Sequence, residues 1–216
     1  MATKAEQRER TRAEIVRIAT RRFAEQGYAG VALEDLVAEA GLTRGALYHH
    51  FGSKEGLFRA VVERAQAEVA DAVDVAASGD GDGDGDGAGD RGAGDGDREQ
   101  LTDRFLAGCR AFLVASLAPE VRRILLVDGP AVLGWGGWRE GDLQTSARLL
   151  AEGVEELAEA GVIETRGLAA VTSLLSGALN EVALANAEAP DPARGIDEAV
   201  DALRRMLSGL SPSRAT

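Results

Sequence analysis

The sequence is poor in several residue types, and each shortage excludes a class of protein. Its one cysteine, Cys109, excludes an internal disulfide and any zinc site built from cysteines, and it agrees with a reducing cytoplasm. Aromatic residues make up only 4% of the 216 residues, so Leu, Ala and Val must supply the core, which favours helices over sheets. No run of about 18 apolar residues occurs, and no early apolar run follows the first basic residues. We therefore expect a cytoplasmic, all-α protein without a signal peptide or a membrane span.

Histidine is equally scarce. The only two histidines, His49 and His50, are adjacent, and neighbouring helix positions point about 100° apart, which disfavours a chelating pair. The sequence contains no glycine-rich phosphate loop and no nucleophile elbow, and the glutamates between residues 152 and 159 have the spacing of a solvated helix face. We therefore expect neither catalysis nor a bound metal or cofactor.

Charge is distributed unevenly along the chain, whose formal net charge is −12. Residues 1–64 contain eleven Lys and Arg against nine Asp and Glu, whereas the remainder contains thirteen against twenty-seven. Within residues 1–24 the basic residues outnumber the acidic ones by seven to three. The basic beginning suits a polyanionic partner, and the acidic remainder favours solubility and repels nucleic acid from the wrong face.

Apolar residues at helical spacing predict four helices in the first 77 residues. Gly27 and Gly41 end the first and the second helix, because glycine favours a helix end. Thr43 and Ser53 carry side-chain oxygens that can cap the third and the fourth. The expected helices cover residues 6–26, 33–40, 44–51 and about 54–77.

Residues 78–97, with the sequence SGDGDGDGDGAGDRGAGDGD, contain no apolar side chain larger than that of alanine. Because there is nothing to bury, backbone entropy should dominate, and we expect a disordered linker. The run DGDGDG from Asp80 also matches the start of a calcium-binding EF-hand loop, which needs a carboxylate at its twelfth position. That position holds Arg91, or Ala93 when the count begins at Asp82, so a solvated linker is the preferred interpretation.

From Arg98 onward the pattern is again helical, and no segment alternates convincingly as a strand would. Pro119 suits the first turn of a helix, and Gly161 suits the end of one. The segment DGPAVLGWGGW, residues 128–138, is rich in glycine and predicts an irregular connection. The expected long helices cover about residues 139–160, 166–187 and 195–207.

Two short helices joined by AGLT, residues 40–43, predict a helix-turn-helix. Gly41 permits the tight turn, and the second helix is slim enough to enter the major groove of DNA. Gly45, near the start of that helix, has two interpretations of equal weight. It either allows close approach to DNA or is simply tolerated near a helix N-terminus.

The wider pattern closely resembles the DNA-binding domain of TetR-type regulators, the TetR/AcrR family of transcription factors. The resemblance covers about residues 10–60: an amphipathic helix, then GY, then LEDLVAEAGLTRGALYHHFGSKEGLF. It departs from the family at Ala32, where a capping Thr or Ser is usual, and the missing cap costs about 1 kcal/mol.

The resemblance implies which residues face DNA, and their chemistry agrees. Arg44 can donate to both major-groove acceptors of guanine, hydroxyl groups can reach phosphate oxygens, and a helix N-terminus favours an anion. Lys54 is expected to contact phosphate. The residues expected to face DNA are Thr43, Arg44, Gly45, Tyr48 and His49.

The rest of the chain is similar to these regulators in size and helical character. The segment LLVDGPAVLGWGGWRE also resembles one found in a subgroup of them. The resemblance implies that this part binds a small molecule and forms a homodimer through its last two helices, about residues 166–187 and 195–208. The first of these helices has a broad apolar face, and we expect it to form the dimer interface through Leu168, Val171, Leu174, Leu175, Ala178, Leu179 and Val182.

The expected ligand is hydrophobic or amphipathic, because the candidate lining residues combine apolar area with a few polar groups. For Trp135 and Trp138 the alternative is that they only fill the core, and Cys109 is expected to be a buried structural thiol. Asn180 either orients the ligand, fixes the dimer register or faces solvent. The candidate ligand-binding residues are Phe105, Cys109, Phe112, Trp135, Trp138 and Asn180.

These expectations combine into one domain plan and one function. The function is that of a ligand-responsive repressor that binds a palindromic site in double-stranded DNA. The alternative is a helical hydrophobe-binding protein, or an enzyme, that carries an accessory helix-turn-helix. The expected parts are a helix-turn-helix domain at 1–52, a connecting helix at 53–77, the linker at 78–97, and a ligand-binding and dimerisation domain at 98–212.

Overall fold

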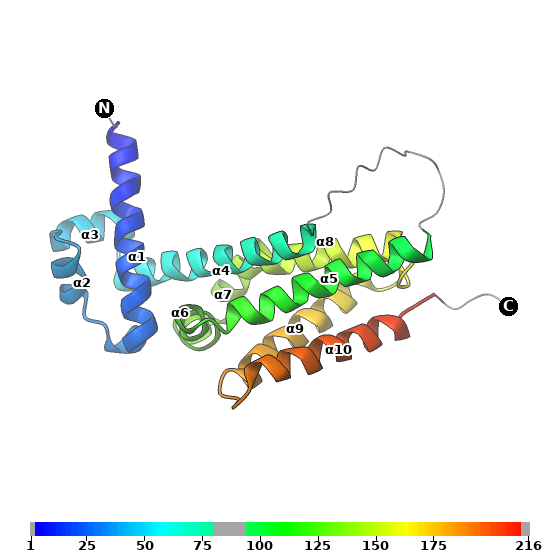
Figure 1. The fold of residues 1–216 in the computed structure, drawn as a ribbon. Helices are drawn as coiled ribbons and strands as arrows, with labels where there is room; N and C mark the ends of the chain where they lie inside the picture. The colour runs from blue at the N-terminus through cyan, green and yellow to red at the C-terminus, as the bar shows by residue number, and fades with distance from the viewer. Residues whose placement is uncertain (1–2, 80–93, 213–216) are drawn as a thin grey trace. The chain divides into compact units, whose positions relative to one another are not determined.

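The computed structural model describes residues 3–79 and 94–212, and within these residues the regular structure is entirely helical, without a strand. The all-α expectation is therefore confirmed. The chain divides into two compact units (Figure 1). The first contains residues 1–67 and 118–141, and the second contains residues 68–117 and 142–216.

The first unit combines the N-terminal helices with a segment from the middle of the chain. Its first helix begins with a capping box, in which Thr3 and Glu6 satisfy each other's backbone N–H groups. The helices are α1 (Lys4–Gly30), α2 (Leu33–Glu39), α3 (Arg44–Phe51), the first part of α4 (Lys54–Ser78), α6 (Pro119–Arg122), the π-helical η1 (Arg123–Asp128) and most of α7 (Gly129–Leu143).

The core of the first unit forms where α1 packs against α2, α6 and η1. Three aromatic rings contact one another in this core. The ring centroid of Phe23 lies 5.9 Å from that of Tyr28 and 5.1 Å from that of Phe58, and the centroids of Tyr28 and Phe58 lie 5.0 Å apart. The other large buried side chains include Ile15, Ile18, Leu36, Leu47, Leu57, Val61, Ile124 and Trp138.

The second unit is a bundle in which α5 packs against α8, α9 and α10, and α9 packs against α8 and α10 (Figure 1). Asp191 caps α10 by accepting a hydrogen bond from the backbone N–H of Arg194 at 3.1 Å. The helices are the end of α4, α5 (Asp95–Ser116), α8 (Ser146–Glu159), α9 (Leu168–Asn186) and α10 (Pro192–Gly209). Its core includes Leu106, Leu113, Val154, Leu157, Ile163, Ala183, Leu203 and Leu207.

The glycine-rich segment of residues 128–138 is helical, so the expectation of an irregular connection is wrong. It forms the end of η1 and most of α7, which is interrupted only at Gly134, where φ is +71°. Burial of Trp138 and a hydrogen bond of 3.1 Å from the Gln66 side chain to its carbonyl stabilise this segment in the first unit. Tertiary packing therefore outweighs the low helix propensity of glycine here.

The expected continuous helix of residues 139–160 is also wrong. α7 ends at Leu143 and α8 begins at Ser146, because the backbone forms a turn that is closed at Thr145. Its backbone N–H donates to the carbonyl of Asp142 at 3.1 Å. Thus two helices replace one.

Two boundaries of the expected domain plan also differ. Of the expected linker at 78–97, residues 80–93 lie outside the described residues, Ser78 belongs to α4, and residues 95–97 belong to α5. The start of α5 is defined by the Asp97 carboxylate, which accepts a hydrogen bond from the backbone N–H of Gly94 at 3.0 Å. Residues 118–141, which the domain plan places in the larger domain, belong to the first unit.

Candidate DNA-binding face and ligand cavity

The helix-turn-helix is formed by α2 and α3. Gly41, in the turn, has a φ of +62°, a conformation that glycine adopts without strain, and the backbone N–H of Leu42 donates to the Val37 carbonyl at 3.1 Å. Thr43 caps α3, because its Oγ1 accepts a hydrogen bond from the backbone N–H of Ala46 at 3.2 Å. The turn and the cap together set the direction of α3.

α3 has one buried side and one exposed side. Leu47 is completely buried in the core of the first unit. An added Cβ at Gly45 would meet no atom nearer than Thr43 Oγ1, at 4.0 Å, so nothing within the described protein requires glycine there. The five residues expected to face DNA are all exposed: Thr43, Arg44, Gly45, Tyr48 and His49.

Arg44 is held by two partners on the exposed side. Its Nη1 lies 3.2 Å from Glu34 Oε1, and its guanidinium carbon lies 5.6 Å from the centroid of the Tyr48 ring. A hydrogen bond with Tyr48, followed by the attraction of both partners, raises the pKa of Arg44. Glu34 belongs to the first turn of α2, whose N-cap residue Ala32 makes no side-chain hydrogen bond.

Lys54 is the first residue of α4, and Ser53 caps this helix by accepting a hydrogen bond from the backbone N–H of Gly56 at 2.9 Å. The Lys54 ammonium lies 4.4 Å from the centroid of the Tyr28 ring, a cation–π distance. Burial lowers the pKa of Lys54. The Lys54 side chain thus joins the start of α4 to the end of α1. It also lies at a helix N-terminus, which favours an anion.

The two histidines differ in exposure. His49 is exposed, whereas His50 is half-buried and its Nδ1 has no hydrogen-bond partner among the described residues. Burial, followed by repulsion from Arg8, His49 and Arg12, lowers the pKa of His50. Across the described part of the chain, no group of three or more His, Cys, Asp or Glu could hold a metal ion.

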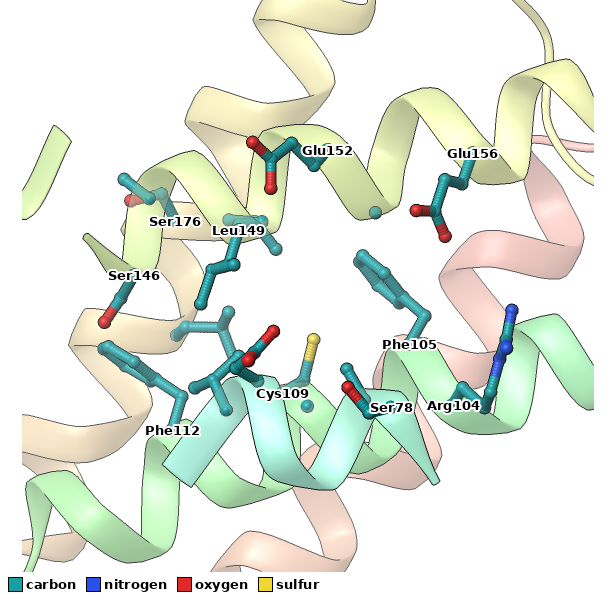
Figure 2. A pocket seen from close by; sticks show the side chains of 18 of the residues that line it. Ser78, Arg104, Phe105, Cys109, Phe112, Ser146, Leu149, Glu152, Glu156 and Ser176 are labelled. Carbon is teal, nitrogen blue, oxygen red and sulfur yellow. The ribbon is translucent and has the colours of Figure 1, made fainter. Parts of the chain in front are cut away.

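The second unit contains a cavity of about 320 Å³, lined by α4, α5, α8, α9 and residues between them (Figure 2). Its volume is at the lower end of the range for small-molecule sites. Four of the six residues expected to contact a ligand line it: Phe105, Cys109, Phe112 and Asn180. The apolar wall also includes Val73, Leu101, Leu149, Leu150 and Leu179.

The thiol of Cys109 faces this cavity (Figure 2) and is buried. Burial raises its pKa to about 12, so it remains protonated at neutral pH. A protonated, buried thiol is a weak nucleophile, as expected for a structural cysteine.

The polar lining of the cavity was not predicted from the sequence. Glu152 and Glu156 are exposed, as the predicted solvated helix face implies, and both also line the cavity. Gly153, between them, was the available signal, because an added Cβ would come within 2.8 Å of the Phe105 ring. A mid-helix glycine that permits close approach of an aromatic ring marks an inward-facing position. The other polar lining residues are Asp74, Ser78, Arg104, Asp142, Ser146 and Ser176.

Trp135 and Trp138, the other two candidate ligand-binding residues, do not line this cavity and belong to the first unit. Trp138 is buried, and an added Cβ at Gly129 would come within 2.9 Å of its ring. Trp135 is 66% exposed and lies with its ring centroid 5.2 Å from that of Trp138. Trp138 therefore fills the core, which is the alternative that the sequence left open.

The residues expected at the dimer interface fall into three groups. Leu174 is 72% exposed, whereas Leu175 and Leu179 are only 3% and 5% exposed and belong to the core of their own unit. The remaining four, Leu168, Val171, Ala178 and Val182, are half-buried.

α9 carries an unusual amount of uncovered apolar surface. By length and composition alone it could cross a membrane, with a mean hydropathy of 1.5 over a window that is 22% buried. The expectation of no such segment counted only unbroken apolar runs, and Asn180 and Glu181 interrupt this one. Leu174 and Leu184 are large apolar side chains exposed on this helix.

Two known sequence families match the chain. Residues 15–61 match bacterial regulatory proteins of the tetR family, and residues 102–210 match the tetracyclin repressor-like C-terminal domain. The transcriptional repressor AcnR of Corynebacterium glutamicum is 44% identical over 63 residues, which cover 29% of this chain. The matched region spans about a third of the length of that relative, 34%.

Solved structures extend the similarity to the whole chain. A TetR-family transcriptional regulator of Pectobacterium atrosepticum is 35% identical, with a TM-score of 0.68 and coverage of 97% of this chain and 98% of that one. RolR, whose structure contains resorcinol, shares the fold at 19% identity, with a TM-score of 0.65 and coverage of 98% and 97%. By both its family matches and its full-length relative, the chain belongs to the TetR family of bacterial transcriptional regulators.

Proposed function

We propose that this protein is a repressor that binds a palindromic operator through α3 and releases it when a small molecule occupies the cavity of the second unit. The observation that carries the DNA-binding part is the exposed face of α3. It presents an arginine, a tyrosine, a histidine and an uncrowded glycine, all exposed, while Leu47 is buried in the core. Arginine forks to guanine, hydroxyl groups reach phosphate, and glycine permits close approach.

The proposal includes a homodimer formed through α9 and α10. Leu174 and Leu184 of α9 and Met206 of α10 are large apolar side chains that are 72%, 44% and 51% exposed. Contact with a second copy would remove this apolar surface from water. Gly177, exposed on α9 with no atom within 4 Å of an added Cβ, permits close approach of a partner helix. Leu175 and Leu179 are excluded from this interface because they are buried in the protomer.

Ligand release follows from differential affinity. In a two-fold dimer the two recognition helices must lie about one DNA turn apart, roughly 34–36 Å. A ligand that binds better to a conformation with another spacing weakens DNA binding, and DNA weakens that ligand by the same factor. The cavity supports this part of the proposal, because its volume and mixed lining suit a small amphipathic molecule.

Footprinting on the DNA that flanks the gene tests the proposal. We expect one protected palindrome, with half-sites separated by one helical turn or a multiple of it. Protection without a preferred site would indicate a nonspecific DNA-binding protein. The absence of protection at every sequence would favour the alternative of a hydrophobe-binding protein or enzyme with an accessory helix-turn-helix.

A further inference from the structure

The charged side chains that line the cavity of the second unit are unbalanced. Within the part of the chain that the structure describes, Arg104 of α5 is the single basic side chain that lines the cavity. Four carboxylates also line the cavity: Asp74 from α4, Asp142 from the end of α7, and Glu152 and Glu156 from α8. The cavity is therefore negative in formal charge.

Two of these carboxylates are not neutralised within the protein. Glu152 is paired with Arg148, whose Nη1 lies 2.6 Å from Glu152 Oε1, and Asp142 is buried and has interactions of its own. Asp74 and Glu156 form no ion pair in the described part of the chain, and both are exposed. They come from α4 and α8, so two different helices contribute negative charge to the lining of one cavity.

The interior of the cavity is apolar. Phe105, Phe112 and Leu149 contribute large apolar surfaces. The thiol of Cys109 is more than nine-tenths buried and faces the cavity. Because this thiol is neutral, it adds no negative charge to the apolar end.

We propose that the cavity selects a small hydrophobic cation, such as an alkyl or aryl ammonium, over neutral and anionic molecules of the same shape. The apolar body of the ligand packs between Phe105, Phe112 and Leu149, and its cationic end faces Asp74 and Glu156. Phe105 and Glu156 both line the cavity (Figure 2), and an aromatic ring in the lining adds attraction for a cation. The inference deepens the proposed function, since it assigns a ligand class to the same site.

An anionic ligand is the competing possibility, because Arg104 could pair with a carboxylate. Such a ligand would enter a site in which the two carboxylates without an ion pair, Asp74 and Glu156, repel it and one guanidinium attracts it. Clefts lined by one sign of charge concentrate the opposite ion, and screening by salt is weaker in a partly buried site than in bulk water. The balance therefore favours the cation.

Three ligands of matched shape test this preference: decylammonium, 1-decanol and decanoate. Their affinities for the full-length protein are measured by calorimetry without DNA, at neutral pH and below the concentrations at which they form micelles. We expect decylammonium to bind on the order of tenfold more tightly than decanol, and decanoate to bind least, as for a charge-assisted contact.

Matched variants locate the effect. Asp74→Asn combined with Glu156→Gln should reduce the affinity for decylammonium to that for decanol and leave decanol binding unchanged. Glu155→Gln removes a charge from the same helix, but Glu155 is exposed and does not line the cavity, so this variant should keep the preference.

The outcomes separate this inference from the proposed function. The inference is overturned if decylammonium and decanol bind equally, if decanoate binds more tightly, or if none of the three binds. It is also overturned if Glu155→Gln loses the preference. Operator release is measured in parallel by a DNA-binding assay. If decylammonium binds with the expected preference and DNA stays bound, the cation preference stands and the ligand-release part of the proposed function fails.

Discussion

The carboxylate of Asp128 accepts a hydrogen bond from the backbone N–H of Tyr28 at 2.9 Å, between residues 100 positions apart in the sequence. The contact lies where α1 is interrupted at Gly27, whose φ of +72° is not helical. Beside it, Arg123 Nη1 donates to the carbonyl of Glu25 at 3.4 Å, and its Nε lies 3.6 Å from Asp128. Side chains from η1 therefore satisfy backbone groups that the broken helix leaves without partners.

Asp128→Ala should destabilise the first unit, because it leaves the N–H of Tyr28 without its acceptor and Arg123 without its carboxylate. The expected loss is about 1–3 kcal/mol of unfolding free energy, measured by urea denaturation. Asp128→Asn is the matched variant, since it keeps an acceptor oxygen and removes only the charge, and it should lose less. Equal stability of Asp128→Ala and the parent would show that this contact contributes nothing.

Gly27→Ala should be more destabilising than Gly52→Ala, although both glycines have nearly the same positive φ, +72° and +73°. At Gly52 an added Cβ meets nothing within 4 Å, so only the backbone strain, on the order of 1–3 kcal/mol, applies. At Gly27 it would meet the Arg123 guanidinium, and moving that side chain breaks its contacts with Glu25 and Asp128. Thermal unfolding of both variants measures the difference, and equal melting temperatures would contradict it.

Arg44→Ala should relax the discrimination between operator and random DNA by about 1–3 kcal/mol, because it removes the group that can fork to guanine. Lys54→Ala is the comparison. It should weaken binding to all sequences alike and reduce the salt dependence, as expected for a phosphate contact. Binding to specific and random duplexes over a range of salt concentrations separates the two. An equal loss on both duplexes for Arg44→Ala would refute the base-reading role.

Gly45→Ala should separate stability from DNA binding. Alanine is a better helix former than glycine, and space is available for its methyl group, so the free energy of unfolding should rise by about 0.5–1 kcal/mol. If the backbone of α3 approaches DNA closely, the same methyl group should lower operator affinity. Unchanged operator affinity in the stabilised variant would favour the interpretation that this glycine is merely tolerated.

Cys109 should make the protein less stable in alkaline solution. Its pKa is raised by burial from the ordinary value of 9.0 to about 12, so the folded state resists ionisation more than the unfolded state does. This stabilising contribution is complete below pH 9 and is lost as the pH rises from about 9 to about 12, at about 1.4 kcal/mol per pH unit. Unfolding free energies above pH 9 should therefore fall more steeply for the parent than for Cys109→Ala. Parallel slopes would contradict the prediction.

The sequence by itself determined the local elements whose causes are local. The helix-turn-helix follows from apolar spacing, from the Thr43 cap and from the conformation that Gly41 permits, and all three act over a few residues. The apolar positions of α9 and α10 are also visible in the sequence, but the expected starts at about residues 166 and 195 differ from the observed starts at Leu168 and Pro192. Family membership was recognisable for the same reason, because the pattern from Gly27 to Leu57 is contiguous.

Only the tertiary structure decided which side chains face inward. Residues 128–138 are helical because Trp138 is buried and Gln66, from α4, bonds to its carbonyl, which local propensity does not reveal. Leu175 is buried while its neighbour Leu174 is exposed, because α8 and α5 cover one side of α9 and leave the other side uncovered. The position of Glu156 has a comparable cause. The helical period defines the faces of α8, but packing against other helices decides which residues line a cavity.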